Sequence, residues 1–120
     1  MGMNTDKQRS GNEFVFNMKA GYLAAFSHPL RLEIIDALRH QSLSVNEISK
    51  RLGASQPTVS KHLALLRRQG VVEARPEGVT VYNSLADQDV LVLLRIVSTI
   101  LDKKLKRSQL ALSKLARERL

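Results

Sequence analysis

Residues 44–70 read SVNEISKRLGASQPTVSKHLALLRRQG, and this segment decides the fold that we predict for the whole chain. Ser44 followed three residues later by Glu47 is a capping box, which starts a first helix. Gly53 can adopt the left-handed conformation that closes this helix, and Ser55 can cap a second one. The segment therefore predicts two short helices joined by a tight turn.

The second of these helices has two different faces. Val59, Leu63 and Leu66 fall at i, i+4 and i+7, which is one buried stripe. The opposite face carries small, polar and basic residues, namely Pro57, Ser60, Lys61, Ala64 and Arg68. A helix that packs by one face and offers such groups on the other suits the DNA major groove. We therefore predict a helix-turn-helix DNA-binding unit.

The charge of the chain is concentrated on two segments. With 120 residues and 43% apolar composition, the chain can bury one modest core. Its formal charge is +8, of which residues 50–75 contribute +5 and the residues from Asp102 onward another +5. Residues 1–49 are neutral and residues 76–101 sum to −2. This distribution predicts an anionic partner for the helix-turn-helix and for the C-terminal end.

Several classes of function lack support in the composition. There is no cysteine, which excludes disulfides and thiolate metal sites. No apolar run approaches the ~20 residues of a membrane span, and the N-terminus lacks a signal-peptide core, so we expect a cytoplasmic protein. No nucleophile and base pair, phosphate-binding glycine loop or metal cluster is visible. We predict that the chain is not an enzyme, and we expect no metal site and no cofactor.

The N-terminal quarter changes character near residue 13. Residues 1–12 are polar without periodicity, which predicts a disordered tail. Phe14, Met18, Tyr22 and Phe26 then follow at repeated i+4 spacing, which is one face of a helix. Large apolar groups on this face can either plug the core of the chain or pack on a second subunit. The spacing alone leaves both alternatives open.

A further helix begins at Ser27-His28-Pro29, with Ser27 or His28 as its cap. Its predicted buried stripe is Leu30, Ile34, Ile35 and Leu38. The face predicted to meet water carries Arg31, Glu33, Asp36 and Arg39.

Residues 71–85, VVEARPEGVTVYNSL, predict a β-hairpin after the helix-turn-helix. We expect strands near 71–75 and 79–84, with the turn at residues 76–78. A hairpin in this place is a wing. Arg75 and Thr80 flank its tip and could reach phosphate, whereas Glu77 would be repelled by DNA. The wing thus either contributes modestly or points away from DNA.

The rest of the chain predicts a long helix that dimerises. From Asp87 no Gly or Pro interrupts, and leucines follow 3,4 heptad spacing at Leu91, Leu94, Leu101, Leu105, Leu112 and Leu115. A break within residues 103–108 stays open. The basic residues after 102 are either a solvated face or an added non-specific DNA contact. We divide the chain into a winged helix-turn-helix and dimerisation domain, 13–102, and a basic C-terminal helical extension, 103–120.

The order of elements, together with SHPLRLEIIDAL at 27–38 and LGASQPTVSKHLALLRRQGVV at 52–72, resembles the ArsR/SmtB family of winged-helix repressors over roughly residues 18–101. The resemblance implies a mainly α fold with a small β-hairpin, in the order α-α-α-α-β-β-α. It also implies a homodimer that pairs through its first and last helices and binds an inverted-repeat operator in double-stranded DNA. The implied dimer interface comprises Phe14, Met18, Tyr22, Phe26, Leu91, Leu94, Val97 and Leu101.

The resemblance also assigns roles within the helix-turn-helix. Gln56 and Ser60 become the leading base-contacting residues, with Lys61 beside them, and Gln can pair in bidentate fashion with adenine. The implied phosphate-contacting positions are Ser55, Thr58 and His62, joined by the outward-facing Arg68 and by Arg75 and Thr80 of the wing. For His62 the alternative is packing against the first helix of the motif.

The sequence departs from the family at its sensor. Arsenic-sensing members carry cysteines where this chain has Ser44 and Asn46, and zinc-sensing members use histidines on the last helix, where this chain has none. We therefore expect a repressor that responds to a small organic molecule, to a partner protein or to no effector, and not to metal. The alternative function is a winged-helix interaction module that docks a partner protein through its long C-terminal helix.

Overall fold

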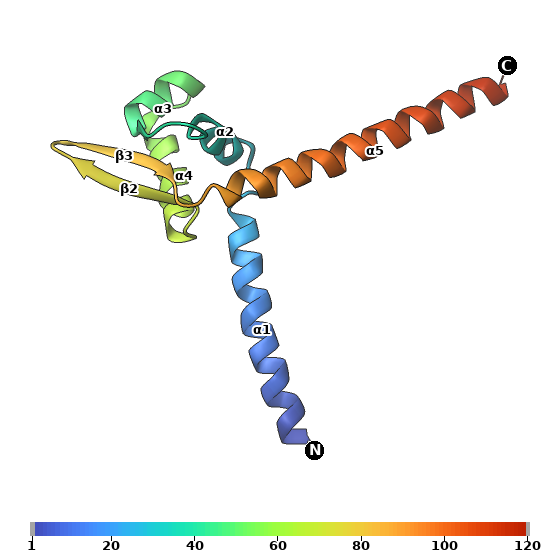
Figure 1. The fold of residues 1–120 in the computed structure, drawn as a ribbon, viewed down its shortest axis with the longest axis horizontal. Coiled ribbons are helices and arrows are strands. Elements are labelled where there is room, and N and C mark those ends of the chain that lie inside the picture. The colour runs from blue at the N-terminus through green and yellow to red at the C-terminus, as the bar shows by residue number, and fades with distance from the viewer. Residues whose placement is uncertain (1, 120) are drawn as a thin grey trace. The chain divides into compact units, whose positions relative to one another are not determined.

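The computed structural model describes residues 2–119 and the side chains of residues 8–117. Its elements are α1 (Gly2–Ala24), α2 (Pro29–Ala37), β1 (Leu43–Ser44), α3 (Val45–Leu52), α4 (Gln56–Arg68), β2 (Val72–Glu77), β3 (Thr80–Leu85) and α5 (Asp89–Arg119), as drawn in Figure 1. The mainly α fold with a small antiparallel sheet confirms the prediction. The chain divides into two compact units between Asp87 and Gln88, and the division after residue 102 into a DNA-binding domain and a basic extension stays a prediction. The two units are described separately below.

The core of the first unit lies among α2, α3 and α4. Its fully buried aliphatic side chains include Ile34, Ile35, Ile48, Val59, Leu63 and Leu66. Those in α2 and α4 occupy the stripes that the helical spacing predicts, since side chains at i, i+3, i+4 and i+7 share one face. Burying one such side chain contributes roughly 1.5 to 3 kcal/mol. The buried stripe of α4 is what directs its opposite face to solvent.

The ends of α3 and α4 confirm the predicted caps. Ser44 Oγ accepts from the Glu47 N–H at 3.1 Å, and Glu47 Oε1 accepts from the Ser44 N–H at 3.1 Å, which completes the capping box. Gly53 closes α3 at φ 65°, a left-handed conformation that glycine adopts without strain. Ser55 is the N-cap of α4. The turn between the helices is therefore specified by residues that lie within it.

The sheet has a strand that the sequence did not predict. Its order is β1-β3-β2, and β1 pairs with β3 through Leu43↔Asn83 and Ser44↔Tyr82. Buried Asn83 reinforces this pairing, because its Nδ2 donates to the Leu43 carbonyl at 3.1 Å. Two residues are too few to show the alternation of apolar and polar side chains in a strand, so β1 can be recognised only from its pairing with β3. The predicted element order is thus corrected by one strand between α2 and α3.

The loop of the wing begins two residues later and ends one residue later than predicted. Glu77 pairs with Thr80, so the loop is Gly78-Val79, and Pro76 lies inside β2 opposite Val81. Gly78 has φ 64°, and glycine at the first position of a two-residue hairpin loop is typical of a type II′ turn. Proline is tolerated in β2 because this strand is at the edge of the sheet.

Helix α1 corrects the prediction of a disordered tail over residues 1–12. The helix starts at Gly2, so residues 2–12 are helical; Met1 lies outside the described residues. Residues 2–12 contain no proline, and each residue added to an existing helix gains a hydrogen bond without a new nucleation cost. A search for apolar periodicity misses such a segment because its sequence has no regular apolar spacing.

The aromatic face of α1 does not plug the core of its own unit. Phe14 is 65% exposed and Met18 is 61% exposed. Tyr22 and Phe26 are half-buried, with ring centroids 5.4 Å apart. Residues 14–18 of this helix therefore present large apolar groups to solvent within one subunit.

The second unit is formed by α5, which is one unbroken helix from Asp89 to Arg119. The break that the sequence left open within residues 103–108 is not present. An exposed ion pair joins Lys106 Nζ to Asp102 Oδ2 at 3.0 Å, one turn apart across the predicted domain boundary. Leu91 and Leu94 are half-buried, while Val97 and Leu101 are 43% and 52% exposed.

Candidate nucleic-acid interface

The outward face of α4 carries four of the nine predicted DNA-contacting residues. Gln56, Ser60, Lys61 and Arg68 are all exposed, while the opposite stripe of the helix is buried. The exposed groups are an amide, a hydroxyl and two cations, which together can hydrogen-bond base edges and neutralise phosphates. The packing of α4 on α2 and α3 thus produces the polar surface that the sequence predicts.

Two hydroxyl groups meet at the N-terminus of α4. Ser55 Oγ accepts from the Thr58 N–H at 3.4 Å and donates to Thr58 Oγ1 at 2.8 Å. Both side chains are exposed. Because the first amides of a helix and its dipole favour negative charge, a phosphate oxygen suits this position. The structure brings Ser55 and Thr58 together with Gln56 at this end of the helix.

Gln56 has a side-chain partner that sequence reasoning missed. Its Nε2 donates to Oδ1 of Asn46 at 2.9 Å, from the first residue of α4 to the start of α3. Both residues are exposed and lie ten positions apart. Periodicity and capping rules relate positions within one helix, so neither could reveal this contact. Asn46 therefore joins the candidate site.

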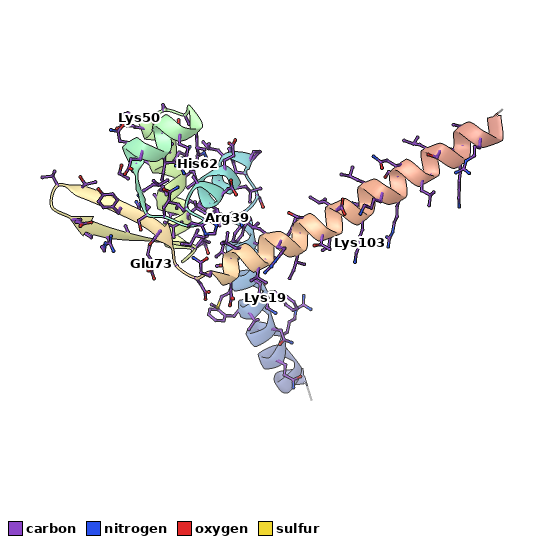
Figure 2. The ribbon with its side chains drawn as sticks, turned by 45° about the horizontal axis from the view of Figure 1, so that its top comes forward. Lys19, Arg39, Lys50, His62, Glu73 and Lys103 are labelled. Atoms are coloured by element: carbon purple, nitrogen blue, oxygen red, sulfur yellow. The ribbon has the colours of Figure 1, made fainter. Side chains whose placement is uncertain are left out.

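His62 is the predicted DNA contact that the structure turns inward. It is 9% exposed, its ring centroid lies 4.4 Å from that of His28, and Arg31 Nη1 lies 3.2 Å from its Nδ1. Burial lowers the pKa of His62 below 6.5, and His28, Arg31 and Lys61 lower it further by charge repulsion. A neutral ring suits this geometry because Nδ1 can then accept from the guanidinium. Figure 2 marks its place in the first unit. The ring thus packs against His28 and Arg31 at the start of α2, whereas the packing alternative named the first helix of the motif, which is α3.

Arg31 corrects the prediction of a solvated side chain on α2. Its Nε donates to the Ala25 carbonyl at 2.8 Å, and its Nη2 donates to the Ala24 carbonyl at 3.1 Å. Ala24 is the last residue of α1 and Ala25 follows it, and the Ala24 carbonyl also accepts from the Ser27 N–H at 3.1 Å. A third contact of the guanidinium is with His62, so Arg31 connects the end of α1 to the buried side of α4.

The wing places its two predicted contacts on opposite strands. Arg75 in β2 is exposed, and its Nη2 lies 3.5 Å from Oε2 of Glu77. An exposed pair of this kind contributes less than about 1 kcal/mol, so it competes weakly with a phosphate for the guanidinium. Thr80 stands opposite Glu77 at the start of β3. The Glu77 carboxylate near the tip of the wing is therefore paired with Arg75 on the same strand.

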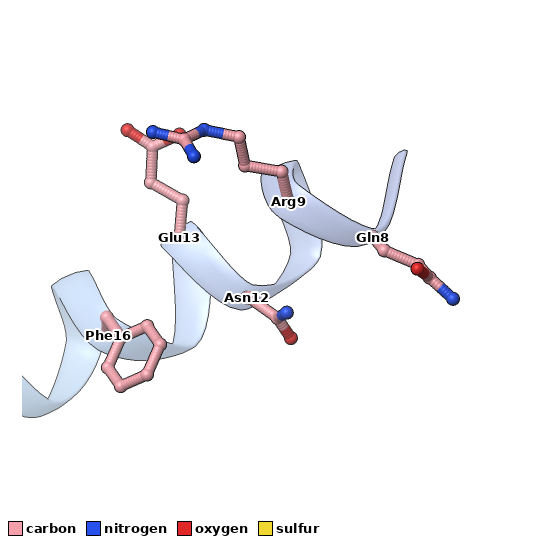
Figure 3. Close-up of a pocket in the computed structure, with 5 residues that line it drawn as sticks. All are labelled: Gln8, Arg9, Asn12, Glu13 and Phe16. Atoms are coloured by element: carbon pink, nitrogen blue, oxygen red, sulfur yellow. The ribbon is translucent and has the colours of Figure 1, made fainter. Parts of the chain in front are cut away.

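The described residues offer few other kinds of site. A hollow on α1 is lined by residues of that helix only, Gln8, Arg9, Asn12, Glu13 and Phe16 (Figure 3). Among the residues whose positions are described, no three histidine or carboxylate side chains are grouped so that they could hold a metal ion. No helix in the described part of the chain is both long and apolar enough to cross a membrane.

Comparison with protein families identifies the central segment. The family model described as "Bacterial regulatory protein, arsR family" matches residues 28–74, which run from the start of α2 into the wing. The nodulation protein NolR of Rhizobium meliloti is 37% identical over 81 residues, covering 68% of this chain and 66% of that protein. The transcriptional activator HlyU of Vibrio cholerae is 40% identical over 75 residues, covering 62% of this chain and 69% of that protein.

Solved structures show the same architecture. Rv0081 of M. tuberculosis superposes with a TM-score of 0.70 at 31% identity, covering 77% of this chain and 93% of that one. The protein Mb0332 of Mycobacterium bovis, described as a homodimeric winged helix-turn-helix DNA-binding domain, gives 0.72 at 30% identity, with 80% and 89% covered. The transcriptional repressor BigR of Xylella fastidiosa gives 0.64 at 33% identity, with 77% and 94% covered.

Proposed function

The chain belongs to the ArsR family of bacterial regulatory proteins and is a winged helix-turn-helix transcriptional regulator; we propose that it acts as a homodimeric repressor on an inverted-repeat operator. The observation that carries this proposal is the exposed face of α4, where an amide, a hydroxyl and two cations stand above a buried stripe. Because the proposed target is chromosomal DNA, the proposal also agrees with the expected location in the cytoplasm.

In the proposed complex, α4 lies in the major groove. Gln56 pairs with an adenine through its amide, and Ser60 and Lys61 contact the neighbouring base pairs. Ser55 and Thr58 bind a phosphate at the helix N-terminus. Phosphates further along are contacted by Arg68 and by Arg75 and Thr80 of the wing. His62 supports α4 from behind by packing on His28 and Arg31.

The dimer that we propose pairs the first and last helices of two subunits. Support comes from Phe14 and Met18 on α1 and from Val97 and Leu101 on α5, which expose between 43% and 65% of their surface. Fully burying a side chain of this kind contributes roughly 1.5 to 3 kcal/mol. A twofold axis would set two α4 helices about 34 Å apart, in successive major grooves of a palindromic site. The homodimeric description of Mb0332 agrees with this arrangement.

We propose that the chain does not respond to a metal ion, and that it responds to a small organic molecule, to a partner protein or to no effector. Ser44 and Asn46 stand where arsenic-sensing members carry cysteines, and both already have structural roles. Ser44 caps α3, and Asn46 accepts a hydrogen bond from Gln56. Their hydroxyl and amide oxygens are also poor ligands for the soft metals that thiolates select. Operator affinity measured by fluorescence anisotropy should be unchanged by stoichiometric zinc or arsenite. A shift of tenfold or more would contradict the proposal.

The central test is selection of genomic DNA fragments by the purified protein, followed by sequencing. The proposal expects an imperfect palindrome with half-sites about one helical turn apart. A reporter that carries this site across its promoter should be silenced when the regulator is expressed. Activation of the reporter would show that the protein is an activator and not a repressor. If random DNA competes as well as the selected fragments, sequence-specific binding is wrong.

The interaction-module alternative has one observation in its favour. Leu105, Leu112 and Leu115 on α5 are 64%, 66% and 53% exposed, and they lie on the leucine seam. The DNA competition separates the two functions, since a module that only docks a protein has no preferred DNA sequence.

A further inference from the structure

We propose that Asn46 is a positioning residue for base recognition, because it fixes the orientation of the Gln56 amide. This inference rests on the proposed function, in which Gln56 contacts a base. It goes further by assigning the discrimination at that base to a pair of residues from two helices. Gln56 touches the DNA in this scheme, and Asn46 acts through Gln56.

The geometry joins two rigid backbones. Asn46 lies in the first turn of α3, whose start is held by the capping box of Ser44 and Glu47. Gln56 is the first residue of α4, whose start is held by Ser55. The turn between them is closed by a hydrogen bond from Ser49 Oγ to the Ala54 carbonyl. With both backbones held, the bond of 2.9 Å from Gln56 Nε2 to Asn46 Oδ1 fixes the glutamine side chain.

The chemistry of the amide turns this orientation into specificity. A glutamine side chain that is free to rotate can offer its donor and acceptor in either order. In the structure Asn46 turns Oδ1 toward Gln56, and because an amide oxygen can only accept, Nε2 of Gln56 faces it. One N–H of Nε2 is used by this bond, which leaves the second N–H and Oε1 of Gln56 for a base. In the major groove adenine offers an acceptor at N7 and a donor at N6, which match this pair.

Losing the partner should therefore cost discrimination more than affinity. Ordering a rotatable side chain on binding lowers an association constant by about 3- to 10-fold. In Asn46→Ala this loss would fall on the operator that carries the matching adenine. Random DNA is bound mainly through phosphate contacts and makes no use of the amide orientation.

The test is a double-mutant cycle on the full chain. The four proteins are the wild type, Asn46→Ala, Gln56→Ala and the double variant. Affinity is measured by fluorescence anisotropy for the selected operator, for the operator changed at the base pair whose preference Gln56→Ala relaxes, and for random DNA. We expect Asn46→Ala to reduce discrimination at that base pair by about 3- to 10-fold and to leave random DNA within about twofold. In the Gln56→Ala background it should have no further effect.

A charge-altering variant distinguishes positioning from a structural role. Asn46→Asp keeps an oxygen that accepts from Gln56 but adds a negative charge near the DNA. Its discrimination ratio should stay at the wild-type value while all DNA sequences bind more weakly. A residue needed only for the fold would not separate these two quantities. Asn12→Ala removes the same side chain from an exposed site on α1 and should change neither.

The possible outcomes are separable. Additive effects of the two alanine substitutions would mean that Asn46 contacts DNA by itself, and would overturn the proposal. Equal losses on the operator and on random DNA would overturn it as well. If the wild type discriminates and Gln56→Ala does not, while Asn46→Ala behaves as wild type, only this inference fails. If the wild type itself shows no discrimination, the proposed function fails.

Discussion

The face of α4 and the face of α1 are opposite kinds of surface within one compact unit. On α4 the exposed groups are polar, and the apolar stripe behind them is fully buried by α2 and α3. On α1 the exposed groups include Phe14, Phe16 and Met18, each more than 60% exposed. The first surface is completed within the subunit. The second is a large apolar surface of the kind that marks a protein interface, and a second copy of the chain would cover it.

The largest effect should come from removing the support of α4. Leu63 is fully buried, so Leu63→Ala should leave a cavity and lower the free energy of unfolding by about 2 to 5 kcal/mol. Urea denaturation followed by circular dichroism measures this change. Ser60→Ala, an exposed position on the same helix, is the control and should stay within about 0.5 kcal/mol. Equal destabilisation by both variants would contradict a distinction between the two faces of α4.

The exposed face of α1 should show the opposite behaviour. Phe14→Ala should leave the stability of one subunit nearly unchanged, because its ring is 65% exposed there. It should weaken dimerisation by about 2 to 4 kcal/mol per dimer, since both copies lose the ring. Sedimentation equilibrium over a range of concentrations measures the association. Asn12→Ala on the same helix is the control, and an unchanged dimer in Phe14→Ala would remove this face from the interface.

Two residues of α4 should separate specificity from affinity. Gln56→Ala should cost about 1 to 3 kcal/mol on the operator and relax base preference at one position in each half-site. Arg68→Ala should weaken binding to all sequences alike and reduce the slope of log affinity against log salt by about 1 per subunit. Anisotropy titrations at several salt concentrations measure both quantities. A loss of base preference in Arg68→Ala would show that the assignment is wrong.

The smallest effect should come from protonation of His62. Its pKa is lowered in the folded protein, so the unfolded chain binds the proton more readily, and stability should fall as the pH drops from 7 through 6.5 toward 5. The reason is that a protonated ring would be buried beside Arg31 and could no longer accept at Nδ1. Urea midpoints measured across this pH range should show this slope in the wild type. The slope should be smaller in His62→Gln, and an identical slope would exclude His62 as its source.

Much of the helix-turn-helix could be predicted because its determinants are local. The capping residues of α3 and α4 make hydrogen bonds to backbone groups no more than four residues away, so the local sequence is sufficient to predict them. These residues are Ser44, Glu47, Gly53 and Ser55. The buried stripe of α4 follows from the 3.6-residue period alone. The early helix over residues 2–12 was missed for a related reason, since a polar sequence without regular apolar spacing has no period to detect.

What the amino-acid sequence by itself determined is the wing, the caps and the polar face of α4, all of which depend on short-range backbone geometry and side-chain period. Only the tertiary structure decided the partners that come from distant segments. Asn46 meets Gln56, Arg31 connects the end of α1 to His62, and β1 forms by pairing with β3. These contacts join residues whose spacing in the chain carries no period, so they arise when the helices and the sheet pack together.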